Sequence, residues 1–168
     1  ALLGDTHVGL TVPQRTDWVS WVYDHIAARD AAAVCHVGDI MDYGSVDEYD
    51  LYLSTVPDEL WPRLHHVPGN HEWRWDPTAR ERYHELLGAT RYSFDAAGIR
   101  FIALNPSHLL QEGGGFGEHG MAWLVDELDQ APQGAPIILL CHFPFGFDNY
   151  LAVFQQDFHL NLRNSAIV

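Results

Sequence analysis

The sequence predicts an α/β fold in which a mainly parallel sheet is flanked by helices. Short apolar runs alternate with longer amphipathic stretches through the first half of the chain, which is the rhythm of repeated β-α units. Polar clusters that contain Asp, His and Asn follow these apolar runs, as ligand-binding residues do at the carboxyl edge of such a sheet. With 168 residues the chain has the length of one domain, so we treat residues 1–168 as a single domain.

Three predicted strands alternate with three predicted helices in the first half of the chain. The strands are 1–4, 33–37 and 65–67, and the helices are 13–29, 45–54 and 77–87. Pro13 and Pro77 stand where a first helical turn tolerates proline, and Gly88 is placed to end its helix.

The rhythm changes in the second half of the chain. Two strand-like runs at 91–95 and 99–105 are joined by Ala96-Ala97-Gly98, which predicts a hairpin. The remaining predicted elements are a helix at 121–128, a strand at 137–141, a helix at 150–162 and a last strand at 166–168. The irregular stretch 106–120 has the length of a lid or binding loop, with simple surface disorder as the alternative.

The charge of the chain argues against a nucleic-acid partner. Its formal net charge is -14, from 23 acidic residues against 9 basic ones, and every basic residue is arginine. Non-specific nucleic-acid binding needs basic residues that displace counterions from phosphates, so no such groove is expected. No apolar run approaches the roughly 20 residues that span a bilayer. Cys35 and Cys141 are expected to be buried free thiols, and the compartment and oligomeric state stay open.

Four polar clusters stand directly after predicted strands and supply the candidate chemistry. They are Gly4-Asp5-Thr6-His7, Gly38-Asp39-Ile40-Met41-Asp42, Gly69-Asn70-His71-Glu72 and Cys141-His142. Asp, His and Asn make a mixed oxygen and nitrogen donor set, which suits Zn, Mn or Fe better than Ca or a thiolate site. Each cluster alone is a weak signal, because an Asp in a Gly-Asp turn is more often a loop residue. Four clusters in order at strand ends favour a metal site.

A centre with two metal ions needs a ligand that both ions share. A carboxylate can bridge ions about 3.5 to 4 Å apart, and Asp39 is our candidate. Asp5 and His7 are two residues apart, so on an extended backbone their side chains would leave on one face and close on a single ion. Asn70 and His142 would complete the second ion. The net positive charge of such a centre would attract a phosphate ester and hold a bridging hydroxide at neutral pH.

The four clusters, with Tyr43-Gly44 added to the second, resemble the first four sequence blocks of the calcineurin-like metallophosphoesterase superfamily. Residues 101–105 and Trp123-Leu124 resemble the strand and the helix that follow in this family. The resemblance implies a four-layer αββα sandwich of two mixed sheets. It also implies two transition-metal ions (Mn, Fe or Zn) with these ligands: Asp5, His7 and Asp39 on one, and Asp39, Asn70 and His142 on the other.

The resemblance further implies an enzyme that hydrolyses a phosphate mono- or diester, with a small-molecule phosphate ester as substrate. The bridging hydroxide would attack phosphorus in line, and His71 would contact the phosphate or protonate the leaving oxygen. The alternative is a metal-poor binding module that keeps the fold without catalysis. Because all the residues expected from the four blocks are present, the sequence favours the enzyme.

The sequence departs from the family pattern in two places. Members carry a fifth block, Gly-His-x-His, after a late strand, whereas this sequence ends at Val168 in what resembles that strand. We therefore expect a domain truncated before its last metal-binding loop, with three protein ligands on each ion. Tyr43 stands where the protein Ser/Thr phosphatases carry arginine, which disfavours that branch.

Other polar and aromatic residues are expected to support the site or the core. Asp42 and Glu72 should hydrogen-bond a ligand or a turn and not bind an ion. His36, His65 and His66 should be packing or hydrogen-bonding histidines. Aromatic residues flank two clusters and form either a wall for a nucleobase or aryl leaving group or a cover over the core: Trp73, Trp75, Phe143, Phe145 and Phe147.

Overall fold

The first sheet consists of three parallel strands in a computed structural model that describes residues 1–107 and 117–143. In spatial order the strands are β1 (Leu2–Leu3), β2 (Val34–Val37) and β3 (Leu64–Val67). Because all three strands run the same way, the turns that follow them meet at one edge of the sheet.

Three helical segments connect these strands: α1 (Pro13–Ala27), α2 (Val46–Thr55) and the 3-10 helix η1 (Asp58–Arg63). Pro13 occupies the first turn of α1, where its missing N–H has no intrahelical partner to lose. A capping box starts α2, because the Ser45 hydroxyl accepts from the Glu48 N–H at 3.3 Å while the Glu48 carboxylate accepts from the Ser45 N–H at 3.2 Å.

The second sheet is mixed. It contains β4 (Tyr92–Ala96), β5 (Ile99–Ala103) and β6 (Ile137–Leu140), with β4 antiparallel and β6 parallel to the central β5. Ala97 and Gly98 both have positive φ, of 50° and 78°, as the two central residues of a tight hairpin turn require. Helix α3 (Ala79–Leu86) precedes this sheet, and α4 (Gly117–Asp129) connects β5 to β6.

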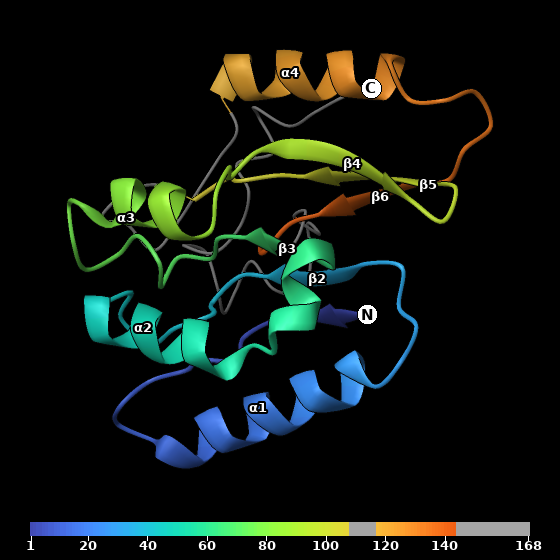
Figure 1. Cartoon of the computed structure of the whole chain (residues 1–168). Coiled ribbons are helices and arrows are strands. Elements are labelled where there is room, and N and C mark those ends of the chain that lie inside the picture. The colour runs from blue at the N-terminus through green and yellow to red at the C-terminus, as the bar shows by residue number, and fades with distance from the viewer. Residues whose placement is uncertain (108–116, 144–168) are drawn as a thin grey trace, which may run out of the picture.

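The elements form four layers (Figure 1). Helix α4 covers the outer face of the second sheet, the two sheets lie face to face, and α1 with α2 covers the outer face of the first sheet. Three clusters of buried side chains fill the three spaces between the layers. Strand alternation decides which space a residue enters: Ala103 packs with Cys35 and Val67 between the sheets, whereas Ile102 and Leu104 pack with Leu124 of α4.

The predicted α/β fold with two sheets is confirmed. The second sheet is mixed as expected, whereas the first is parallel throughout the part that the structure describes. The helix predicted at 77–87 begins only at Ala79, because Asp76 accepts from both the N–H and the hydroxyl of Thr78 and forms a turn there. Helix α4 begins four residues before its predicted start, and η1 was not predicted. The elements expected at 150–162 and 166–168 lie outside the described residues.

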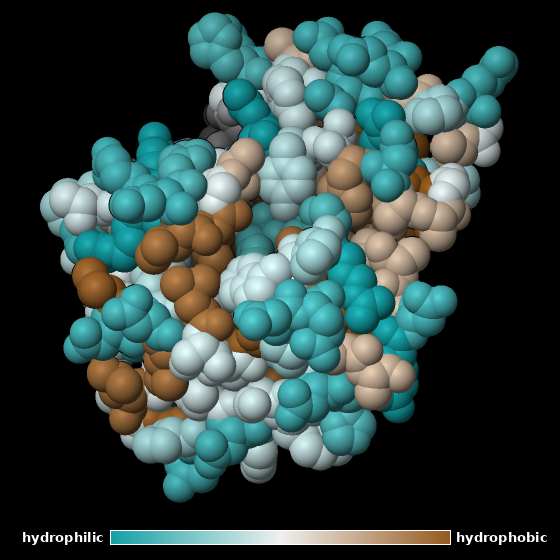
Figure 2. Space-filling model, in the orientation of Figure 1, coloured by the Kyte–Doolittle hydropathy of each residue, from teal (hydrophilic) through white to brown (hydrophobic). Residues whose placement is uncertain are grey.

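The surface carries both hydrophilic and apolar regions (Figure 2). Figure 2 shows hydrophilic side chains over the region of α4 and apolar ones concentrated around α2. Trp18 and Trp21 are large exposed aromatic residues on α1, 73% and 60% accessible. No helix within residues 1–107 and 117–143 has both the length and the apolar character that a membrane span requires.

Candidate metal centre

The turn after β1 carries two candidate ligands on left-handed backbone. Asp5 has a φ of 54° and His7 a φ of 45°, a region in which Asp and His are among the few tolerated non-glycine residues. Backbone hydrogen bonds hold this turn against the one after β2, because Asp5 N–H donates to the Gly38 carbonyl at 2.9 Å and His7 N–H donates to the Asp39 carbonyl at 3.0 Å. The expectation of extended backbone at Asp5 and His7 is therefore wrong.

Thr6, between these two residues, anchors the turn to the core. Its hydroxyl donates to the Ile40 carbonyl at 3.0 Å and lies 2.9 Å from His36 Nε2. Burial keeps the pKa of His36 well below its usual value, so the ring stays neutral. His36 thus acts as a hydrogen-bonding core histidine, as the sequence predicted.

The turn after β2 presses Asp39 against the turn after β3. Asp39 has a φ of 50° and Gly38 a φ of 94°. A Cβ on Gly69 would overlap Asp39 Oδ1, and a Cβ on Gly38 would lie 2.6 Å from the Gly69 nitrogen. Neither position has room for a side chain, so the two glycines allow the close approach of these turns.

The Glu72 carboxylate ties the same two turns together. Its Oε1 accepts from the N–H groups of Ile40 at 2.8 Å and Met41 at 3.1 Å, while its Oε2 accepts from Gly69 at 2.6 Å and Asp39 at 3.1 Å. Glu72 is fully buried. All of its described contacts are therefore to the backbone, which fits the predicted role of holding a turn and not an ion.

The structure divides the candidate donors into two groups, each with donor atoms within 4.8 Å of one another: Asp5, Asp39 and His142, and His7, Asp42 and His71. Asp39 faces both groups. Its Oδ1 lies 3.4 Å from His142 Nε2, whereas its Oδ2 lies 3.8 Å from His7 Nε2 and 3.9 Å from His71 Nε2. This partition differs from the predicted one, because Asp5 groups with His142 and His7 groups with His71.

Backbone carbonyls orient two of the histidines toward the centre. His142 Nδ1 lies 2.9 Å from the Val37 carbonyl oxygen, and His71 Nδ1 lies 2.6 Å from that of Asp42. A carbonyl can only accept, so each Nδ1 carries the proton and each Nε2 is left to face the candidate site. Asn70 joins the first group, since its Oδ1 lies 3.3 Å from His142 Nε2.

The donor set fits a transition metal. His7 Nδ1 is buried, lies 3.3 Å from Asp42 Oδ1 and makes no hydrogen bond within the described residues. Buried ring nitrogens normally have a hydrogen-bond partner or a metal. Asp42 itself accepts from Arg15 at 3.1 Å and from the Thr11 hydroxyl at 3.2 Å, which partly neutralises it. Carboxylate, imidazole and amide donors together suit Zn, Mn or Fe.

The ionisable side chains at this centre shift one another's pKa values. Burial opposes ionisation of Asp39, but His142 and the His71 N–H outweigh it and hold the pKa of Asp39 below its usual value. Burial likewise opposes the charged form of His142, yet the interaction with Asp39 raises the pKa of His142 to about 9. Burial and the Asp39 charge raise the pKa of Glu72 to about 7, against the lowering by its backbone N–H donors.

The remaining candidates support the fold. His66 is buried with its Nε2 2.8 Å from the Tyr52 hydroxyl, and His65 stacks on Phe94 with ring centroids 3.5 Å apart. Trp73 and Phe143 are buried, so these two aromatic residues cover the core. Trp75 is exposed, and Phe145 and Phe147 lie outside the described residues. Sequence reasoning missed the left-handed backbone at Asp39, for which the only signal was an Asp directly after a glycine.

Two solved structures share this fold. A dimetal phosphatase from Danio rerio matches with a TM-score of 0.64 and 18% sequence identity, over 86% of this chain and 69% of that one. A purple acid phosphatase isolated from yellow lupin (Lupinus luteus) seeds matches with a TM-score of 0.62 and 16% identity. That match covers 94% of this chain and 32% of the lupin chain, so this chain spans about a third of its length. No match was found among curated protein sequences.

The layered fold of this chain is the architecture of these two phosphatases. The sequence profile of the calcineurin-like phosphoesterases matches residues 1–163. The chain belongs to this family, which confirms the resemblance seen in the sequence.

Metal binding is expected to strengthen as pH rises from 7 to 9. A metal ion bound by His142 would displace the proton on this side chain, whose pKa is about 9. Apparent affinity for Mn should therefore rise by up to about tenfold per pH unit below 9 and level off above it. The same raised pKa stabilises the metal-free fold below pH 6.5 and loses this contribution as pH rises through 9. Calorimetric titration with Mn across this pH range would detect the proton that is released on binding. An affinity for Mn that does not change with pH would contradict the assignment of His142 as a metal ligand.

Proposed function

We propose that this chain hydrolyses a phosphate mono- or diester at a dinuclear metal centre. The observation that carries the proposal is the position of Asp39, whose two carboxylate oxygens face different groups of donors. A carboxylate in that position can be shared by two ions, as a two-metal site requires. A binding module without metal would not need the converging donors that this chain retains.

One ion would be held by Asp5, Asp39, Asn70 and His142, and the other by His7 and Asp39, with Asp42 and His71 nearby. Mn, Fe or Zn ions held there would supply positive charge for the phosphate and a water of lowered pKa as the source of the nucleophile. The protein's part is to fix the donors. Glu72 and the two glycines do so by holding the turns after β2 and β3 in contact.

His71 is suited to assist the leaving group. Its Nδ1–H donates to the Asp42 carbonyl, so its Nε2 faces the centre, and its side chain stays 24% accessible. A histidine held in this way, when it also carries a proton on Nε2, can give that proton to the departing oxygen of the ester. We therefore assign His71 to the substrate and not to an ion.

Two exposed aromatic rings stand beside His71. Trp75 and Tyr43 are 46% and 49% accessible, their ring centroids lie 5.5 Å apart, and Trp75 lies 6.3 Å from the His71 ring. Exposed rings next to a group that contacts the leaving oxygen can stack on an aryl or nucleobase leaving group. This placement supports an aromatic ester as substrate.

The protein is expected to hydrolyse an aryl phosphate when Mn is supplied and to lose that activity with a chelator. The reason is that the donor set above holds the ions that provide the nucleophile. Release of p-nitrophenol from p-nitrophenyl phosphate and from its diester measures turnover and separates the two ester classes. Addition of Mn, Fe or Zn after chelation should restore it. Turnover that resists the chelator would rule out the two-metal mechanism.

His71→Ala is expected to lower kcat while leaving bound metal nearly unchanged. Loss of a general acid typically costs about 10²- to 10⁴-fold in rate. Metal content by elemental analysis and kcat should be measured on the same samples. His25→Ala on the exposed face of α1 is the matched control, and it should change neither quantity. If the His71→Ala variant lost bound metal in proportion to activity, His71 would have to be reassigned as a metal ligand.

A further inference from the structure

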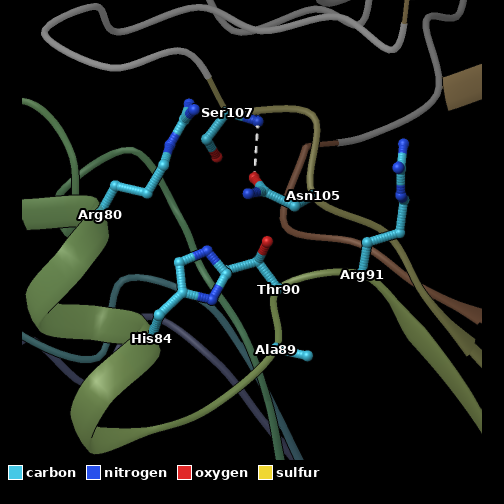
Figure 3. A pocket seen from close by; sticks show the side chains of 7 residues that line it. All are labelled: Arg80, His84, Ala89, Thr90, Arg91, Asn105 and Ser107. Carbon is cyan, nitrogen blue, oxygen red and sulfur yellow. Dashed lines mark hydrogen bonds between the residues drawn. The ribbon is translucent and has the colours of Figure 1, made fainter. Parts of the chain in front are cut away.

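A hollow outside the candidate metal centre is lined by polar and basic side chains. It has a volume of about 450 Å³, within the range of about 300 to 1,000 Å³ that is usual for small-molecule sites. Its polar lining comes from α3, the segment before β4 and the segment after β5: Arg80, His84, Thr90, Arg91, Asn105 and Ser107. Figure 3 shows Arg80 and Arg91 on opposite sides of the hollow, with Asn105 and Ser107 between them.

The two arginines have no acidic partner within the part of the chain that the structure describes. The chain has a net charge of -14, and Arg15, Arg82 and Arg100 each pair with a nearby carboxylate. Arg80 and Arg91 instead lie near Trp73 and Trp123, with Cζ 5.9 Å and 5.1 Å from the ring centroids.

Such contacts leave the guanidinium available to a ligand. The N–H donors lie in the guanidinium plane, so a ring contact through its face does not use them. These donors match the oxygen geometry of phosphate. Two arginines that lack a carboxylate partner among the described residues of an acidic protein, on either side of one hollow, favour an anionic ligand.

Ser107 gives an independent indication. It is 6% accessible, and its Oγ is buried without a hydrogen-bond partner in the described residues. Its backbone N–H donates to Asn105 Oδ1 at 3.0 Å, so the oxygen of the Asn105 amide is engaged and its nitrogen is the group that could donate to a ligand (Figure 3). A buried hydroxyl without a partner is uncommon and requires an explanation. A bound oxyanion that accepts from Ser107 would provide one.

We propose that this hollow binds a small phosphate-bearing anion through Arg80 and Arg91, with Ser107 and Asn105 as further donors. Asn105 and Ser107 follow β5 at the sheet edge where His142 follows β6, because Ala103 pairs with Leu140 in parallel strands. The anion is either a second phosphate group of a compound held at the metal centre or a separate ligand. The proposal does not rest on hydrolysis at that centre.

Titration of chelator-treated, metal-free protein with inorganic pyrophosphate tests the proposal without any contribution from bound metal. Calorimetry should show binding that weakens as salt rises, since the contacts are ionic. Arg80→Ala and Arg91→Ala should each weaken binding about tenfold, the usual loss for a hydrogen bond to a charged group. Arg29→Ala removes an arginine that follows α1 and contacts the His25 carbonyl, so it is the matched control and should bind normally.

Ser107→Ala provides a second check, because it removes the buried hydroxyl without changing the charge. It should weaken binding less than either arginine variant, with melting temperatures unchanged in the arginine variants. Absence of binding at millimolar pyrophosphate, or equal affinity in Arg80→Ala, Arg91→Ala and Arg29→Ala, would overturn the proposal.

The source of the anion is distinguished with Mn-loaded protein. Should the anion be a second phosphate of the substrate, Arg91→Ala will raise KM for a bisphosphate and leave KM for a monophosphate unchanged. Should it be a separate ligand, both KM values will stay constant while pyrophosphate binding is lost. A protein without turnover would contradict the proposed hydrolysis alone, because the metal-free titration still decides whether the anion binds.

Discussion

Replacing Asp39 with asparagine is expected to abolish turnover and to weaken metal binding more than any other single ligand change. The amide has the same shape but no charge, and one of its two terminal atoms is a donor. Since one Asp39 oxygen faces His142 and the other faces His7, either orientation of the amide removes a ligand from one group. The loss should exceed the roughly 10- to 100-fold typical of removing a hydrogen-bond partner of a ligand. Elemental analysis and turnover on the same samples measure both effects.

Two comparisons show whether Asp39 is shared. Asn70→Ala removes a donor from one side only, so it should retain more activity, and the reverse order would exclude a bridging role for Asp39. The metal-free protein gives a readout that does not depend on catalysis. Asp39→Asn removes the interaction that raises the pKa of His142 to about 9, so the fall in melting temperature between pH 6.5 and 9 should largely disappear.

Those parts of the fold that depend on local pattern were predicted from the sequence. The hairpin predicted from Ala96-Ala97-Gly98 is present, with Ala97 and Gly98 in its turn between the antiparallel strands β4 and β5. Pro13 marked a helix start that the structure contains. The 3-10 helix η1 was missed because a segment of six residues is too short to show a helical repeat of apolar residues.

The structure brings together side chains that the sequence singled out, but it arranges them differently from the expectation. Asp5 and His7 were placed on extended backbone because their spacing of two suggested a shared face. The hydrogen bonds from this turn to Gly38 and Asp39 impose positive φ instead and send the two side chains to different groups. Contacts between turns far apart in the sequence determine this outcome, and no local pattern encodes them.

The surroundings of Glu72 also could not be predicted from the local sequence. The sequence placed it beside the candidate ligands Asn70 and His71, but it did not reveal which groups would surround the carboxylate. The structure gives it four backbone N–H donors from two turns that are thirty residues apart in the chain. The carboxylate therefore determines how closely Asp39 approaches Gly69, and thereby the shape of the metal centre.

Glu72→Gln is expected to lower both the stability of the protein and its metal affinity. Both carboxylate oxygens of Glu72 accept two N–H groups each, whereas glutamine has one acceptor oxygen, so two buried N–H groups lose their acceptor. Each such group costs about 1–3 kcal/mol, and about 1 kcal/mol lowers Tm by roughly 2–4 °C in a domain of this size. Thermal melts at pH 8, above the Glu72 pKa of about 7, compare the variant with ionised wild type.

Glu48→Gln is the matched control for this variant, because Glu48 is also a buried glutamate that accepts backbone N–H groups. Its bonds to the N–H groups of Tyr43 and Ser45 and to the Ser45 hydroxyl all use one oxygen, Oε2. A glutamine can keep that oxygen in place, so its Tm should fall much less than that of Glu72→Gln. Loosening the turn that carries Asp39 should also weaken metal binding by about 10- to 100-fold in Glu72→Gln, with no such loss in Glu48→Gln. Equal effects of the two variants on Tm and metal content would show that the hydrogen bonds accepted by both Glu72 oxygens do not determine the arrangement of the candidate metal ligands.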